Sequence, residues 1–421
     1  MQQTATTAFD RARHVGRRSL LGVLAGLALG AVVAALDTAL VTVLPATLRF
    51  DPDHAGTLVG SIVGGIITVA VFSLWMRTVM VGLVSVEFSP RLLASYLEDR
   101  FQENVTYGML AALAFCCVVL FTIPAAAAPL VGMTLSMFIA FGALVTVLLA
   151  IQHAVRSLSV SQVIRDLTDA VLTMIEQLPY ADEEHEDVPD VEPPDTTDTV
   201  HARELGWVVA IDLERIADGL APGSTAQVVT PVGSFLRPGH PIVEVDRSPV
   251  DEDAIRSAVE VHDARGPTTT IGFGLDQLVD VGQHALLASE NDSATAHEVL
   301  LHLGACIEAL LQHSPRATIH LDDEDRAVRS PPEPGASVHV GRAFRRLRPG
   351  AAKQIEASRD VLETLGTVHR AAERVEDEAT INAVRSEAAE LLELQEKLGV
   401  MTHTELNELT QLARHLVLLD E

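Results

Sequence analysis

Lysine is nearly missing from this chain: Lys353 and Lys397 are the two lysines among 421 residues, so arginine carries almost all of the positive charge. Aromatic residues make up 4% of the chain, and there are three cysteines. Cys116 and Cys117 lie in an apolar run and Cys306 lies in a helical pattern, without a C-x-x-C spacing. This pattern excludes a disulfide framework and a cysteine-based zinc site.

The excess of acidic residues is confined to the second part of the chain. Residues 1–178 hold ten Arg against eleven Asp or Glu, whereas residues 179–421 hold 20 basic and 46 acidic groups. Such a polyanionic region argues against nucleic-acid binding, which needs a basic surface. It indicates either attraction of cations or of a basic partner or, as we favour, adaptation to high salt, where screening weakens the repulsion between carboxylates.

The first part of the chain contains several long apolar runs. A membrane-spanning helix needs about 20 mainly apolar residues, and four segments meet that length. The sequence therefore predicts a transmembrane domain over residues 19–178 with four spans, at about 19–45, 57–86, 105–123 and 130–152.

The orientation of these spans follows from the N-terminal arm, residues 1–18. Its basic residues are Arg11, Arg13, Arg17 and Arg18. Positive residues stay on the cytoplasmic side of a membrane, so we expect a multi-pass protein of the cell membrane with both termini in the cytoplasm. A signal peptide would begin similarly, but the following run is too long for a signal core.

Two charged residues fall within the predicted spans, Asp37 in the first and Arg77 in the second. Charged groups inside a membrane usually line a path or face the interior of a bundle, although Asp37 could lie at the outer interface and Arg77 could extend to the inner one. Thr68 and Ser73 add polar groups to the glycine-rich second span. These four residues are the candidates for a pore.

A short polar sequence, Glu87-Phe88-Ser89-Pro90-Arg91, follows the second span. Ser89 and Pro90 are typical of a helix start, and the apolar residues that follow recur at helical spacing. The pattern predicts a helix over 89–103 at the membrane interface. The apolar pattern of the fourth span continues to residue 177, which predicts one long helix leaving the membrane.

The remaining chain reads as an α+β portion. Residues 179–200 form an acidic, proline-rich linker, and residues 201–248 have the short alternating runs and turn glycines of a small β-module. This pattern resembles the barrel-sandwich shape of biotinyl and lipoyl carriers, but the modifiable lysine of those carriers is missing. Carrier function is therefore excluded, and a structural or docking module remains.

Residues 249–317 have a mainly helical pattern that includes the sequence Asn291-Asp292-Ser293. These residues are typical of a helix N-cap, with a helix beginning near Ala294. The same cluster could bind a cation together with nearby histidines, but His297 and His302 are five residues apart and do not share a helix face. We favour the cap.

Residues 318–350 are predicted to be an irregular connection, and residues 351–421 to form two or three amphipathic helices. The connection carries a basic cluster at Arg342, Arg345, Arg346 and Arg348. In so acidic a region, we expect these arginines to pair with internal carboxylates or to lie near the membrane rather than to bind phosphate.

Two motifs resemble a known family. The sequence Ser85-Val86-Glu87-Phe88-Ser89-Pro90-Arg91-Leu92-Leu93 resembles the S-x-x-F-S-P-R-L-L signature of the membrane proteins called domain of unknown function 2254. The segment from Phe273 to Ala296 resembles that family's block F-G-L-x-x-L-V-D-I-A-x-R-A-L-S-P-x-I-N-D-P-x-T-A. The resemblance covers roughly residues 15–315, and the acidic composition indicates a member of haloarchaeal type.

The resemblance implies an architecture but no activity. Residues of the second motif and its surroundings that we single out are Arg265, Asp280, His284, Asn291, Asp292 and Thr295. The chain departs from the family pattern at His284, where the family has Arg, at Ser293, where it has Pro, and at Thr270, where an acidic residue is usual. We therefore expect any ligand binding or structural contact made by this block to be weaker in this chain.

These observations predict a multi-domain membrane protein with a four-helix transmembrane domain, a small barrel-sandwich-like β-module and a helical bundle. The polar residues of the spans favour an oligomeric channel or channel-like pore for ions, built from copies of this chain in the lipid bilayer. The alternative is a membrane-anchored scaffold or sensor whose acidic tail binds an unknown partner protein. An enzyme comes third, because the chain shows no G-x-S-x-G elbow, metal cluster, phosphate loop or cofactor motif.

Overall fold

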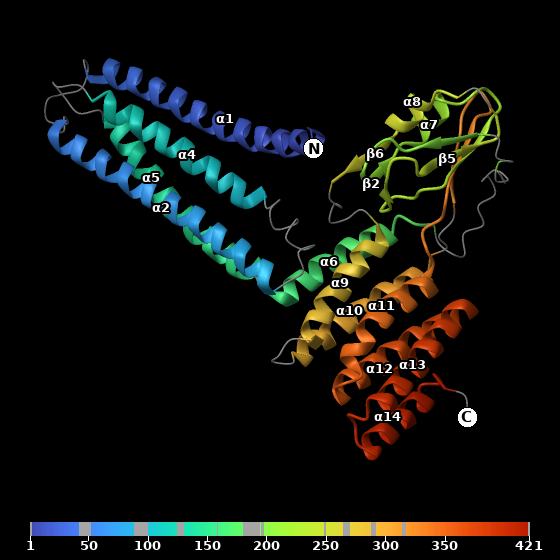
Figure 1. The fold of residues 1–421 in the computed structure, drawn as a ribbon. Helices are drawn as coiled ribbons and strands as arrows, with labels where there is room; N and C mark the ends of the chain where they lie inside the picture. The colour runs from blue at the N-terminus through green and yellow to red at the C-terminus, as the bar shows by residue number, and fades with distance from the viewer. Residues whose placement is uncertain are drawn as a thin grey trace. The chain divides into compact units, whose positions relative to one another are not determined.

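The computed structural model describes residues 2–41, 52–87, 100–123, 130–157, 159–179, 194, 198–247, 250–263, 270–287, 292–313 and 317–419 (Figure 1). It divides into two compact units. Unit 1 comprises Met1–Glu87 and Leu93–Ser159, and unit 2 comprises Phe88–Leu92 and Val160–Glu421.

Unit 1 consists of long apolar helices. They are α1 (Gln2–Val41), α2 (Pro52–Glu87), α4 (Arg100–Phe121) and α5 (Leu130–Ser157). Their mutual contacts bury a small core that includes Val59, Phe115 and Val147. Large apolar side chains also point outward: Phe121 is 86% exposed and Phe138 is 69% exposed. An outer surface of this kind is what lipid chains would cover.

Helices α1 and α4 run side by side in close contact (Figure 1). Gly22, Gly26 and Gly30 recur every fourth residue of α1, which places them on one helix face. A Cβ atom at Gly26 would lie 2.2 Å from the carbonyl oxygen of Ala111. Only glycine permits this approach, so the three glycines form the small-xxx-small packing motif of unit 1.

Helix α2 carries the same small-xxx-small spacing at Gly60 and Gly64, but these glycines do not pack. Among the described residues, a Cβ at either position would meet no atom within 4 Å. This face of α2 is therefore open within the described part of the chain.

Unit 2 contains a helical core and a β-rich part, each with its own buried cluster. The helices of the core are α6 (Val160–Ile175), α9 (Ile271–Leu287), α10 (Ser293–Leu311), α11 (Ala336–Ala351), α12 (Ile355–Arg374), α13 (Glu378–Leu398) and α14 (His403–His415). Fully buried Leu303, Phe344 and Leu365 represent this core.

The β-rich part has two sheets. A five-stranded sheet has the order β1-β5-β3-β8-β7, and a three-stranded sheet has the order β4-β2-β6. Their strands are β1 (Asp198–His201), β2 (Gly206–Ile211), β3 (Thr225–Val228), β4 (Phe235–Leu236), β5 (Pro241–Val245), β6 (Val259–His262), β7 (Thr318–Leu321) and β8 (Ala327–Ser330), with short helices α7 (Leu213–Asp218) and α8 (Glu252–Ser257). The α+β class agrees with the prediction, while the barrel-sandwich shape is not established by these sheets.

The expectation of an irregular connection over 318–350 is wrong. Its first part forms β7 and β8, and β8 pairs in parallel with β3, which lies about one hundred residues earlier in the chain. Its second part forms α11, which buries Val340, Phe344 and Leu347. Strand pairing over such a separation leaves little local signal, because the segment is too short and polar to show alternation.

The prediction of one helix from the fourth span to residue 177 is also wrong. Helix α5 ends at Ser157 and α6 begins at Val160. Ser157 and Ser159 flank the break, and serine favours helix ends because its hydroxyl competes for backbone hydrogen bonds. Ile164, Val171 and Ile175 of α6 are buried in the core of unit 2.

Among the described residues, five helices are long and apolar enough to cross a membrane. Four belong to unit 1, at Leu20–Leu40, Asp53–Met76, Glu103–Phe121 and Val131–His153. The fifth, α10 at Ser293–Leu311, was not among the predicted spans. Half of its apolar window is buried, against 11–28% for the other four, because α10 packs between α6, α9 and α12.

Candidate functional site

Asp37, the acidic residue of the predicted first span, clamps two helices of unit 1 together. Its side chain projects from α1, where the residue is 3% exposed. The carboxylate accepts hydrogen bonds from the backbone N–H of Val131 at 2.9 Å and of Gly132 at 2.8 Å, in the first turn of α5. Those amides have no partner inside their own helix, so Asp37 caps α5 from a neighbouring helix.

Gly132 makes this clamp possible. A Cβ at position 132 would lie 2.9 Å from the Asp37 carboxylate and 3.0 Å from Val119. The carboxylate also meets the positive end of the α5 dipole, which favours a negative charge there. Asp37 is therefore bonded within unit 1 and has a structural role in the single chain.

The other pore candidates lie on α2. Thr68 is exposed, and its hydroxyl donates to the carbonyl of Gly64 at 2.9 Å within the same helix. Ser73 is half-buried. Arg77 belongs to α2, but its side chain lies outside the described part. Asp37 is bonded to α5 and Thr68 to its own helix, so these described contacts do not bring the two residues together.

A cluster of paired charged residues in unit 2 lies where α9 packs against α11. Asp276 and Asp280 are one turn apart on α9, and Arg342 and Arg346 are one turn apart on α11. Asp276 pairs with both arginines, through its Oδ1 to the Nη1 of Arg346 at 3.3 Å and through its Oδ2 to Arg342. Arg346 also pairs with Asp280.

Gln283 completes this ladder one turn further along α9. Its side-chain oxygen accepts from Arg346 at 2.8 Å, and its amide nitrogen donates to the backbone carbonyl of Arg346 at 2.7 Å. The Asp276 side chain is 5% exposed and that of Arg346 is 29% exposed. Carboxylates so far from water require such partners, so the ladder fixes the register of α9 on α11.

A second ion cluster joins α11 to α13. Arg348 pairs with Glu387 at 3.0 Å and with Glu390. The Glu387 side chain is 5% exposed. Burial raises the pKa of Glu387 above its usual range, while the Arg348 charge opposes that rise. The prediction that the arginine cluster pairs with internal carboxylates is confirmed for Arg342, Arg346 and Arg348.

Arg345, the remaining member of that cluster, faces a groove of about 540 Å³ between α11 and α13. Helix α11 contributes Ser337, Val338, Gly341 and the three arginines 342, 345 and 346; helix α13 contributes Ala383, Ser386, Glu387 and Glu390. The guanidinium of Arg345 is exposed and makes no hydrogen bond or ion pair within the described part of the chain. Its positive charge acts to lower the pKa of Glu387. This groove is the candidate binding site of unit 2.

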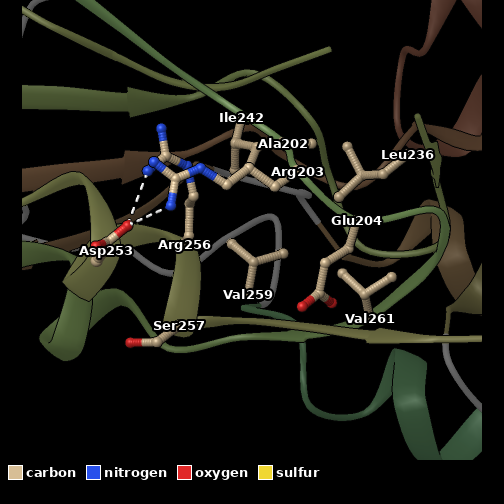
Figure 2. A pocket seen from close by; sticks show the side chains of 10 residues that line it. All are labelled: Ala202, Arg203, Glu204, Leu236, Ile242, Asp253, Arg256, Ser257, Val259 and Val261. Carbon is tan, nitrogen blue, oxygen red and sulfur yellow. Dashed lines mark hydrogen bonds and ion pairs between the residues drawn. The ribbon is translucent and has the colours of Figure 1, made fainter. Parts of the chain in front are cut away.

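A smaller pocket of about 250 Å³ lies in the β-rich part (Figure 2). Its floor is apolar and includes Leu236 and Val259. At one side, Asp253 accepts from Arg203 at 2.8 Å and from Arg256 at 3.0 Å, as the dashed lines in Figure 2 show. Arg256 is fixed further by the His201 carbonyl at 2.9 Å and by Glu252. Because Arg203, Arg256 and Asp253 are already paired, they offer a ligand few free polar groups; Glu204 is the further charged residue of the lining.

The motif residues near α10 have a structural role. Asp292 is the N-cap of α10, and its carboxylate accepts from the Thr295 backbone N–H at 3.1 Å and from the Thr295 hydroxyl at 2.5 Å. These bonds from Thr295 lower the pKa of Asp292 below its usual range. The capping interpretation is thus confirmed. His284 is exposed on α9.

Several predicted residues fall outside the described part. Arg265, Asn291 and the motif residues Ser89, Pro90 and Arg91 lie there, as does most of the predicted interfacial helix, although α4 already begins at Arg100. Glu87 is the last residue of α2, and its side chain lies outside it too. Within the described residues, no cluster of three or more His, Cys, Asp or Glu could hold a metal ion.

Comparison with known proteins places this architecture in a family. A family model described as "Predicted membrane protein (DUF2254)" matches residues 13–367. The chain belongs to this DUF2254 family. The family resemblance drawn from the two sequence motifs is therefore confirmed.

The related DUF2254 proteins include an uncharacterized protein of Mycobacterium bovis, 28% identical over 313 residues, and an uncharacterized protein of Mycobacterium tuberculosis, 28% identical over 312 residues. Each match covers 69% of this chain and 59% of the relative, so the chain spans about three fifths of their length. No solved structure matches the chain. The relatives are mycobacterial and give no support to the haloarchaeal origin expected from the charge.

Sequence reasoning missed two features of this DUF2254 protein. The first is Asp276, which lies four residues before Asp280 and binds the same arginine. The signal was present, since an Asp spacing of four on α9 matches the Arg spacing of four on α11. The second is the Gly22, Gly26 and Gly30 repeat, whose small-xxx-small spacing is as plain as that on α2.

Proposed function

We propose that this DUF2254 protein is a membrane-anchored binding protein, a sensor or scaffold in which unit 1 spans the lipid bilayer and unit 2 binds a ligand or partner. The chain is a predicted membrane protein with several apolar helices suited to a multi-pass arrangement. The proposal assigns it no enzymatic activity and no cofactor.

The location of the polar groups carries this proposal. In unit 1, Asp37 is bonded to the first turn of α5 and the hydroxyl of Thr68 to its own helix, so these groups are satisfied without water. In unit 2, the α11–α13 groove holds Arg345 with no hydrogen bond or ion pair in the described part. Polar surface available to a ligand thus supports a site in unit 2 better than a pore in unit 1.

The proposed topology has four spans, α1, α2, α4 and α5, and places α10 in the core of unit 2. Arginines at positions 11, 13, 17 and 18 favour a cytoplasmic N-terminus, and an even number of spans then puts unit 2 in the cytoplasm. The excess of carboxylates in unit 2 further supports adaptation to high ionic strength, where their repulsion is screened.

An oligomeric ion channel is the second candidate, favoured by the open face of α2. Gly60, Gly64 and Gly65 have space around them, and Thr68 is exposed nearby. A second copy of the chain could pack there through small residues and bring α2 hydroxyls together around an axis. In that case the protein would be a homo-oligomer that conducts ions.

The binding function is tested by hydrogen exchange on the full chain in nanodiscs. Panels of anionic, cationic and neutral metabolites are added singly, and backbone protection is followed by mass spectrometry. The proposal predicts that at least one class slows exchange in unit 2, since ligand binding to the folded state stabilises it. Unchanged exchange in unit 2 with every class, together with ion conductance, would favour the channel.

A further inference from the structure

We propose that the groove between α11 and α13 binds a phosphoryl group, with Arg345 as the principal contact and Arg342 as the second. This inference rests on the proposed binding function and names the chemistry of its ligand. The shared chemistry is that of a phosphate monoester, whether it is carried by a soluble metabolite or by a lipid headgroup.

The arginines of α11 differ in how many of their donors are already used. Arg346 donates to two aspartates and a glutamine, and Arg348 pairs with two glutamates. Arg342 donates to Asp276 through one amino group, and its side chain is 49% exposed. Arg345 donates to none of the described residues. Arg342 and Arg345 therefore retain N–H groups for a ligand.

These free donors converge because of helix geometry. Arg342 and Arg345 are three residues apart, so they share the face of α11 that also carries Val338 and Gly341. All four line the groove. Guanidinium groups match phosphoryl oxygens in planar, paired hydrogen bonds, and two of them on one face can hold one phosphoryl group.

The acidic residues of the groove do not fill this role themselves. Glu390 pairs with Arg348 and accepts from the Ser386 hydroxyl at 3.3 Å. Glu387 pairs with Arg348 from a buried position. Both carboxylates are thus directed to Arg348, while Arg345 keeps an exposed guanidinium.

The test uses the full chain in phosphatidylcholine nanodiscs at low salt. Binding of inorganic phosphate and of glycerol phosphate is measured by calorimetry, and hydrogen exchange of α11 is followed in parallel. A second arm replaces part of the phosphatidylcholine with phosphatidic acid. Protection of α11 by the soluble probes indicates a metabolite ligand, whereas protection by phosphatidic acid alone indicates a headgroup.

Arg345→Gln is expected to weaken phosphoryl binding about tenfold, the usual loss for one charge-assisted hydrogen bond. Arg345→Lys should retain part of the affinity, because lysine keeps the positive charge but lacks the planar, paired N–H donors of a guanidinium group. The matched control is Arg203→Gln, an exposed arginine of the β-rich part, which should bind like the unmodified chain.

The inference is overturned if no phosphoryl probe protects α11, or if the Arg203 and Arg345 variants lose affinity equally. Protection of unit 2 by a ligand without a phosphoryl group would preserve the proposed function and refute this ligand class. The two failures are thus distinguishable.

Discussion

Replacing Asp276 by Asn tests the central ion ladder of unit 2. The substitution keeps the shape of the side chain and one hydrogen-bond acceptor but removes the negative charge that faces Arg342 and Arg346. Both arginines would then lie near a neutral group, with Asp280 as the remaining carboxylate of the ladder. The α9–α11 contact should weaken as a result.

The size of the effect follows from exposure. Removing one partner of a fully buried pair costs about 3–5 kcal/mol. Here the Asp276 side chain is 5% exposed, but the side chains of Arg342 and Arg346 are 49% and 29% exposed, so water can partly hydrate them. Since solvent reduces the cost, we expect local destabilisation of about 2 kcal/mol.

Native-state hydrogen exchange on the full chain measures this loss locally, which avoids assuming that both units unfold together. A destabilisation of about 2 kcal/mol corresponds to about 30-fold faster exchange in α9 and α11. The control is Asp253→Asn, because the Asp253 side chain is 78% exposed where it pairs with Arg203 and Arg256. Water can hydrate these partners, so the change should alter stability by less than about 1 kcal/mol. Equal effects of the two variants would refute the reasoning.

Four further outcomes are expected. Asp37→Ala should destabilise unit 1 by about 1–3 kcal/mol, because the first amides of α5 lose their cap while buried, as measured by unfolding in detergent; an unchanged midpoint would argue against the clamp. Gly26→Val should separate α1 from α4, and a double-cysteine crosslink between these helices should form more slowly than in Gly60→Val. Asp292→Ala should cost about 1 kcal/mol, seen as faster exchange at the start of α10. Burial lowers the pKa of His339 in the folded chain. Its contribution to stability is therefore fully present above the unfolded pKa of about 6.5 and is lost as pH falls toward the folded pKa. His339→Asn should reduce this loss of unfolding free energy at acidic pH, measured by urea titration.

The long apolar helices could be predicted from the sequence because their signal is local. Composition alone marks a 20-residue apolar run as a candidate span, and the Asp292 cap follows from residue type and position. The same rule explains why α10 resembles a span: it is mainly apolar because α6, α9 and α12 bury half of its apolar window. Composition does not show whether protein or lipid covers an apolar helix.

Features that depend on distant partners could not be predicted. Asp37 looks like a pore residue until the first turn of α5 is seen beside it. The pairing of β3 with β8 joins segments separated by α9 and α10. No sequence pattern within either strand identifies the strand with which it pairs. The groove is likewise formed by two exposed helix faces that meet only in the fold.

The most direct test of the account is electrical. The purified full chain, checked for folding and oligomeric state, is reconstituted into planar bilayers at high salt and examined under voltage and tension, with Asp37→Asn alongside. A membrane-anchored binding protein predicts silent bilayers for both proteins. Discrete conductance whose amplitude or selectivity changes with Asp37→Asn would contradict the account and place Asp37 in a pore.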